Sequence, residues 1–120
     1  MKSVNPKIEW SKKSQKDCLR FTFGEKLTGK EAEIAIEEWR EAFQSKSDKS
    51  IILIWDCRKM KGYDSNARVK WTVALKEMKR QIDTIWLITD SHLVKIGAAV
   101  MGVLSSINIK IVNSESEMII

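Results

Sequence analysis

Two short runs of continuous apolar residues limit the fold of this chain more than any other feature. Ile51–Trp55 and Ile85–Ile88 are rich in β-branched side chains, and each is followed by polar residues. Runs of this length and composition are typical of strands that are covered on both faces. Amphipathic helical patterns separate them, and strands joined by helices run parallel in one sheet. We therefore expect an α/β fold with a largely parallel sheet.

The apolar periodicity predicts the order ββαβαβαβ. Ile8 and Trp10 alternate with charged residues, and the apolar residues of Leu19–Phe23 alternate with Arg20 and Thr22. The two segments are expected to form an antiparallel hairpin. Thr28 and Glu31 have the spacing of a capping box and predict a helix start. The remaining expected elements are a helix that begins at Asp64 or Ser65, a helix that begins after Ser91, a last strand over Ile107–Val112, and a helical stub, cut short, from Ser114 to Glu117.

Apolar spacing also predicts which side of each helix faces the sheet. The expected inner residues of the second helix are Ala67, Trp71, Ala74, Leu75, Met78 and Ile82, and those of the third are Val94, Gly97, Ala98, Met101 and Leu104. Trp39, Trp55 and Trp71 are all expected to be core residues.

Length and composition favour a single cytoplasmic domain over residues 1–120. The chain has 120 residues, of which 43% are hydrophobic and 31% charged, so it can form a core without disulfides or metal. Cys18 and Cys57 lie in apolar or strand-like runs and are expected to be buried thiols, and His92 is the only histidine, which leaves too few ligands for a zinc site. The N-terminus, Met1 included, lacks the apolar segment of a secretory signal, and no run is long enough to span a membrane. No cofactor is expected.

The charge balance does not by itself identify a partner. The formal charge is +5, from 21 basic and 16 acidic residues. Lysines are spread along the chain and alternate with glutamates on the helical stretches, which is typical of a solvated surface. A basic stretch with aromatic residues near the N-terminus (Lys7, Trp10, Lys12, Lys13, Lys16, Arg20 and Phe21) leaves nucleic-acid binding as the less favoured interpretation.

The candidate site lies where two predicted strands end. The segment from Asp56 to Asn66 follows the Ile51–Trp55 strand, and Thr89–Ser91 follows the Ile85–Ile88 strand. Carboxyl ends of parallel strands share one edge of a sheet, so we expect both segments to contribute to one surface. Backbone N–H groups at a helix N-terminus would stabilise a phosphate on the Ser65 hydroxyl. The alternative is that Asp64 and Ser65 only cap the helix, and the two interpretations are compatible.

The same segment resembles the central signature of STAS domains, the anti-sigma-factor-antagonist domains typified by the sporulation stage II AA protein. That signature is a strand that ends in Asp, a loop, and then Asp-Ser at the start of a helix, and here it reads Trp55-Asp56-Cys57-Arg58-Lys59-Met60-Lys61-Gly62-Tyr63-Asp64-Ser65-Asn66-Ala67. The resemblance extends over about residues 8–112 and implies a STAS-like, sporulation stage II AA-like fold with about five strands. It also implies that a partner kinase of the anti-sigma type phosphorylates Ser65 and thereby switches binding off.

The sequence departs from the family pattern after Ser65. Asn66 and Ala67 stand where the family has a second serine and a glycine. The Gly62-Tyr63-Asp64 turn, followed on the next helix by Ala67, Trp71 and Leu75-Lys76, resembles instead the STAS-like branch of small bacterial proteins of unknown function, in which the phosphorylation switch is not assured.

We therefore expect a non-enzymatic regulatory domain that binds a protein partner. No Gly-x-Ser-x-Gly elbow or glycine-rich phosphate loop is present. The alternative is a carrier or sensor of a small apolar ligand, which would need an internal cavity of at least ~300 Å³. Membrane insertion is not expected, and the sequence is compatible with a homodimer. The expected partner-binding or switch residues are Asp56, Tyr63, Asp64, Ser65, Asn66, Asp90 and Ser91.

Overall fold

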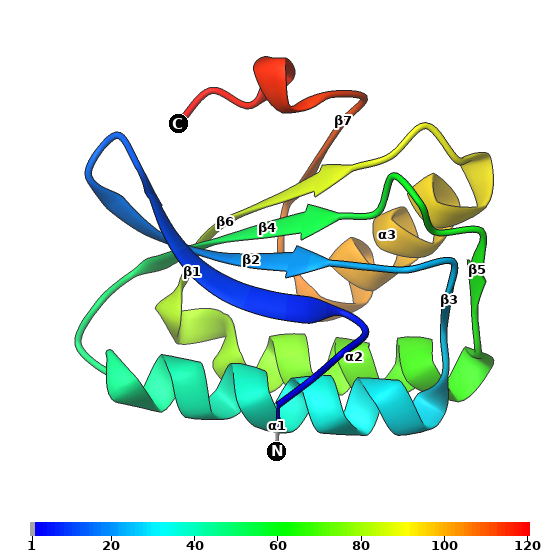
Figure 1. The fold of residues 1–120 in the computed structure, drawn as a ribbon, viewed down its shortest axis with the longest axis horizontal. Coiled ribbons are helices and arrows are strands. Elements are labelled where there is room, and N and C mark those ends of the chain that lie inside the picture. Colours follow the sequence, from blue (N-terminus) through cyan, green and yellow to red (C-terminus); the bar gives the residue numbers. More distant parts are fainter. Residues whose placement is uncertain (1) are drawn as a thin grey trace.

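A five-stranded mixed sheet forms the centre of the molecule (Figure 1). The structure is a computed structural model and describes residues 2–120, so Met1 lies outside it. The strand order is β1-β2-β4-β6-β7. β1 and β2 are antiparallel, and every other neighbouring pair is parallel. The strands are β1 (Lys7–Lys13), β2 (Lys16–Thr22), β4 (Ile51–Asp56), β6 (Ile82–Ile88) and β7 (Ile109–Val112). The predicted hairpin and the largely parallel sheet are confirmed.

Three helices cover one face of this sheet: α1 (Gly29–Ser45), α2 (Ser65–Met78) and α3 (His92–Ser105). The capping box predicted at the start of α1 is present, since the Thr28 hydroxyl accepts from the Glu31 N–H at 3.1 Å and the Glu31 carboxylate accepts from the Thr28 N–H at 3.0 Å. The predicted cap of α3 is also present, where the Ser91 hydroxyl accepts from the Val94 N–H. Within residues 2–120, no helix is long and apolar enough to cross a membrane.

The C-terminal segment covers the opposite face of the sheet (Figure 1). It consists of the end of β7, the short 3-10 helix η2 (Glu115–Glu117) and the residues that follow. Its apolar side chains pack on a second, smaller core, made of Cys18, Ile52, Ile54, Trp86 and Ile88 from the sheet and Val112, Met118 and Ile120 from the segment. All six residues of β4 are therefore buried: Ile51–Trp55, as their continuous apolar pattern predicted, and Asp56 as well.

Aromatic side chains fill the core between the sheet and the helices. Trp39, Trp55 and Trp71 are all at most 3% exposed, as predicted. The ring centroids of Trp39 and Trp71 lie 5.3 Å apart, and those of Phe21 and Trp39 lie 5.4 Å apart in an edge-to-face arrangement. Such contacts add to the free energy gained from burying the rings.

Three predicted assignments near the helix ends are wrong. Ile82 is the first residue of β6, because α2 ends at Met78 and a 3-10 turn, η1 (Lys79–Gln81), follows it. Leu104 is 52% exposed, and Ser105 takes the expected inner position. The last strand begins at Ile109, two residues later than predicted. Two minor elements, β3 (Lys26–Leu27) and β5 (Gly62–Tyr63), form a separate parallel pair that the sequence pattern did not indicate.

The aromatic core predicts a large effect for a single substitution in α2. Trp71→Ala should lower the free energy of unfolding by roughly 3–5 kcal/mol, because it removes a buried ring and leaves a cavity. Val73→Ala on the same helix is the matched control, since Val73 is 57% exposed and should change stability by less than about 0.5 kcal/mol. Urea unfolding measures both values, and a loss below about 1 kcal/mol for Trp71→Ala would contradict this assignment of the core.

Candidate functional site

Backbone hydrogen bonds fix the loop between β4 and α2. The N–H of Lys61 donates to the carbonyl of Glu25 at 2.8 Å, and the N–H of Asp64 donates to the carbonyl of Leu27 at 2.9 Å. These bonds flank the β3–β5 pair and attach the loop to the segment that precedes α1. The start of α2 is therefore held against the start of α1.

Ser65 is the first residue of α2 and is exposed. Asp64 is the N-cap residue, but its carboxylate does not bind an N–H of α2. One carboxylate oxygen accepts instead from the N–H of Gly29 at 3.2 Å, and the other lies 3.3 Å from Lys26 Nζ. Among the described residues, no side chain caps the first N–H groups of α2. Asp64 therefore takes the N-cap position, as predicted, but neither Asp64 nor Ser65 makes a side-chain capping bond to α2.

Asn66 is exposed and lies beside the start of α1. A Cβ atom on Gly29 would lie 2.6 Å from the Asn66 side-chain amide, so the two helix N-termini approach this closely because residue 29 is glycine. Asn66 thus lies next to Ser65 on the exposed N-terminal turn of α2.

Tyr63 is half-buried and packs against α3. Its hydroxyl lies so close to Gly97 that any side chain at position 97 would collide with it. Tyr63 also lines an apolar pocket between the sheet, α2 and α3, together with Leu27, Trp55, Met60 and Met101. The pocket has a volume of about 60 Å³, which is far below the ~300 Å³ expected of a carrier of an apolar ligand. This volume does not favour the carrier hypothesis.

The turn after β6 lies beside the β4–α2 loop. Asp90 is exposed, and Ser91, the N-cap residue of α3, is half-buried. Both residues border a shallow depression of about 520 Å³, whose other sides are Glu25, Arg58, Lys59, Met60 and Lys61. The structure thus brings the two loops together at one edge of the sheet, as their position after parallel strands predicts.

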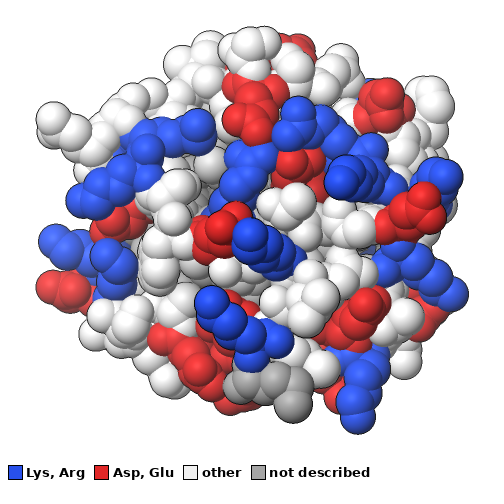
Figure 2. All heavy atoms as spheres, viewed as in Figure 1, with Lys and Arg blue, Asp and Glu red and all other residues white. Residues whose placement is uncertain are grey.

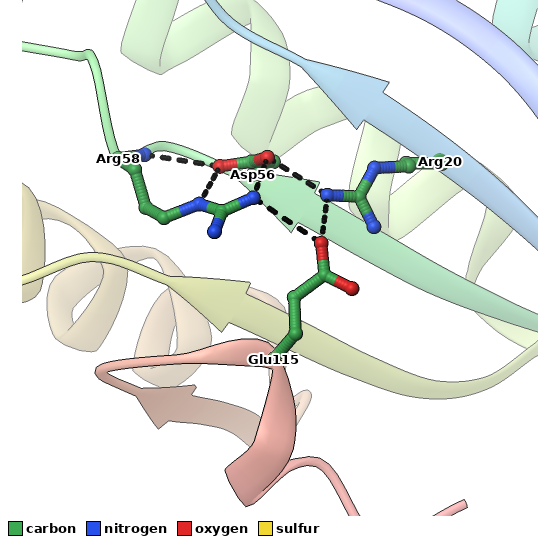
Figure 3. A network of polar contacts seen from close by, with 4 residues as sticks. All are labelled: Arg20, Asp56, Arg58 and Glu115. Carbon is green, nitrogen blue, oxygen red and sulfur yellow. Dashed lines mark hydrogen bonds and ion pairs between the residues drawn. The ribbon is translucent and has the colours of Figure 1, made fainter.

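Asp56 does not face this edge with the other candidate residues. Its side chain lies on the face of the sheet that the C-terminal segment covers, in a network with Arg20, Arg58 and Glu115 (Figure 3). The Arg58 guanidinium donates to the two Asp56 oxygens at 2.9 and 2.7 Å, and Arg20 Nη2 donates to Oδ2 at 2.8 Å. Glu115 Oε1 accepts from Arg20 at 2.5 Å and from Arg58 at 3.2 Å. The network therefore joins β2, the end of β4 and η2.

The charges around Asp56 keep it ionised. Hydrogen bonds from Arg58, and secondarily from Arg20, outweigh the effect of burial and lower the pKa of Asp56 to about 2. Sequence analysis missed Arg20 and Glu115 as its partners. Alternation along β2 does place Arg20 on the opposite face from Phe21, but only the register with β4 and the path of the C-terminal segment bring these residues to Asp56.

Neither cysteine is placed to react. Cys57 is buried, as predicted, and burial raises the pKa of its thiol far above the usual value. Cys18 is also buried, and burial raises its pKa too. Among residues 2–120, no three His, Cys, Asp or Glu side chains gather closely enough to hold a metal ion.

The basic N-terminal stretch is interspersed with acidic partners. Lys7 lies 3.4 Å from Glu9, and Lys12 lies 3.7 Å from Asp17. The exposed ring of Trp10 is covered in part by Lys46, whose Nζ lies 4.9 Å from the ring centroid. Figure 2 shows one face of the molecule, on which acidic and basic side chains are mixed and no single-sign patch stands out.

Comparison with solved structures shows which fold this is. An uncharacterised protein of the DUF3478 family from Shewanella loihica PV-4, described as having a SpoIIAA-like fold, superposes with a TM-score of 0.75. The match covers 92% of this chain and 87% of that one, at 14% sequence identity. The chain has a SpoIIAA-like fold. The fold inferred from the Asp56–Ser65 segment is therefore confirmed. No family model matches the chain, and no curated protein does.

Within the SpoIIAA-like fold, the ion network of Asp56 makes stability depend on pH. The pKa of Asp56 is about 2 in the folded chain and about 3.9 in an unfolded one. The ionised carboxylate therefore contributes about 2 kcal/mol to the free energy of unfolding above about pH 4. This contribution is lost as the pH falls from about 4 to 2. Asp56→Asn should remove this contribution at pH 7 and flatten that part of the profile. Urea unfolding between pH 2 and pH 7 measures both effects.

Asp48→Asn is the control for this prediction, because Asp48 is exposed in the loop that follows α1. Its unfolding profile should match that of the unmodified chain. If Asp56→Asn leaves both the stability at pH 7 and the acid profile unchanged, the network does not secure the C-terminal segment.

Proposed function

We propose that this chain is a non-catalytic regulatory domain whose binding to a protein partner is controlled by phosphorylation of Ser65. The binding surface would be the N-terminus of α2 with Tyr63, Asp64 and Asn66, and the adjacent turn of Asp90 and Ser91. The observation that carries the proposal is the exposed Ser65 at the first position of a 14-residue helix whose N–H groups no side chain caps. The SpoIIAA-like fold supports it by analogy only.

The surroundings of Ser65 suit a phosphoryl group. Uncapped N–H groups and the helix dipole favour negative charge at this position. Asp64 leaves those N–H groups free because its carboxylate binds Gly29 and Lys26. Arg68 lies three residues further along α2, within the spacing at which helix side chains meet, and supplies a guanidinium for the phosphate.

A phosphoryl group at Ser65 would change the surface without unfolding the helix. It adds a charge of about −1.5 to −2 at pH 7, at a helix end where that charge is stabilising. A partner that docks on the neutral hydroxyl would then meet a hydrated dianion, and its binding would weaken. The implied partner is a kinase of the anti-sigma type, and the cytoplasmic location stays a prediction.

A phosphomimetic substitution tests the proposal. The unmodified chain, Ser65→Ala and Ser65→Glu are immobilised, and proteins that they retain from a lysate of the source cells are quantified by mass spectrometry. The protein that binds is then purified, and its dissociation constant for each variant is measured by calorimetry. We expect Ser65→Ala to bind as the unmodified chain does and Ser65→Glu to bind at least tenfold more weakly.

Ser47→Glu is the matched control. Ser47 is exposed in the loop that precedes β4, whereas the proposed surface follows the ends of β4 and β6. It makes the same chemical change away from the proposed surface and should leave the dissociation constant unaltered. A partner that binds Ser65→Glu as tightly as the unmodified chain would rule out control by phosphorylation at this site.

A further inference from the structure

Helix α3 is apolar on its outer side as well as on its inner side. Val94, Gly97, Ala98 and Met101 face the core. On the solvent side, five large apolar residues are between 43% and 80% exposed: Leu93, Ile96, Val100, Val103 and Leu104, here called the α3 stripe. They are half of the ten large hydrophobic residues that are exposed among residues 2–120. A helix that is apolar on all sides is typical of one that is buried on all sides.

We propose that the α3 stripe is a homodimer interface, in which α3 packs antiparallel against α3 of a second copy about a two-fold axis. Leu93, Ile96, Val100 and Val103 follow one another at intervals of three, four and three residues. This is the spacing of a coiled-coil seam, which places the four side chains in one line facing a partner helix. Ala99 is exposed beside the line and is small enough for the two helices to approach closely.

No charge opposes the packing of two copies of the stripe, and the helix dipoles favour the antiparallel arrangement. The stripe itself contains no ionisable side chain, so no like charges meet along it. The first turn of α3 has no acidic residue and the last turn has no basic one, which leaves the helix dipole uncompensated at both ends. Antiparallel packing places the N-terminal turn of one helix beside the carbonyl end of the other, so that the two dipoles attract. A parallel arrangement would instead bring like ends together.

The area of the stripe fits a dimer. Five side chains of these exposures present roughly 400 Å² of apolar surface, as much as the largest apolar patch of a typical monomer. Two copies would together remove about 800 Å² of apolar surface from water. That amount is about the non-polar share of a small standard interface.

A lipid surface fits α3 less well than a second copy does. Helices that lie in a membrane interface pair their apolar side with a strongly charged side. Here the side opposite the stripe is buried against the sheet, and Lys95 is the only Lys or Arg of the helix. Its ammonium group lies 3.4 Å from Asn113 Oδ1, near the end of β7.

Sedimentation of the full chain over a concentration series tests the proposal. We expect a species of twice the 13.8 kDa chain mass that dissociates on dilution. Val103→Glu places a charge in the seam at a position that is 80% exposed, so it should leave the fold intact and weaken dimerisation at least tenfold. Val4→Glu, at a site 90% exposed outside the stripe, is the control and should dimerise normally.

A mixing experiment tests the antiparallel geometry. With the two-fold axis midway between Ile96 and Val100, residue 93 of one copy faces residue 103 of the other. Leu93→Lys and Val103→Glu should therefore each dimerise at least tenfold more weakly alone, and form a heterodimer when mixed. A monomeric chain at about 100 µM would overturn the proposal, as would a dimer that Val103→Glu does not weaken. Co-sedimentation of a monomeric chain with phosphatidylserine vesicles, lost in Val103→Glu, would also overturn it and assign the stripe to a lipid surface.

Discussion

The burial of β4 on both faces is the constraint on which the rest of the structure depends. Its six residues are all buried, so each face needs its own cover. The three helices supply one cover, and the C-terminal segment supplies the other. β4 ends at Asp56 between these two layers, and its last side chain points to the face that the C-terminal segment covers. There Arg20 and Arg58 pair with the Asp56 carboxylate, and Glu115 accepts from the same two arginines.

The burial of β4 on both faces also separates the buried Asp56 network from the exposed edge of the sheet where α2 begins. Side chains alternate along a strand. Asp56 therefore points to the face that the C-terminal segment covers, while Trp55 and Cys57 point to the helices. The chain leaves the sheet after Cys57, and the β3–β5 pair then sets the start of α2 beside the start of α1. Ser65 is exposed at the end of this path, on a helix that is itself anchored by Trp71 in the core.

The features of this structure that depend on local sequence patterns could be predicted, and those that depend on contacts between distant segments could not. The order of the five main strands and three helices, the capping box of Thr28 and the burial of Ile51–Trp55 follow from local periodicity, and all are confirmed. The partners of Asp56 could not be predicted, because they require the β2–β4 register and the path of η2. Leu104 was wrongly predicted to face the core. Apolar residues occur on every side of α3, so their spacing does not identify the side that faces the sheet.

Peptide mapping of the chain isolated from its source cells tests the central claim most directly. Cleavage after Lys61 and Arg68 releases the segment 62–68, in which Ser65 is the only serine and Tyr63 the only other hydroxyl side chain. Tandem mass spectrometry should find a phosphoryl group on Ser65 in chain that is free of its partner, and none in chain recovered from the complex. Segment 62–68 without phosphate in both fractions would contradict the account.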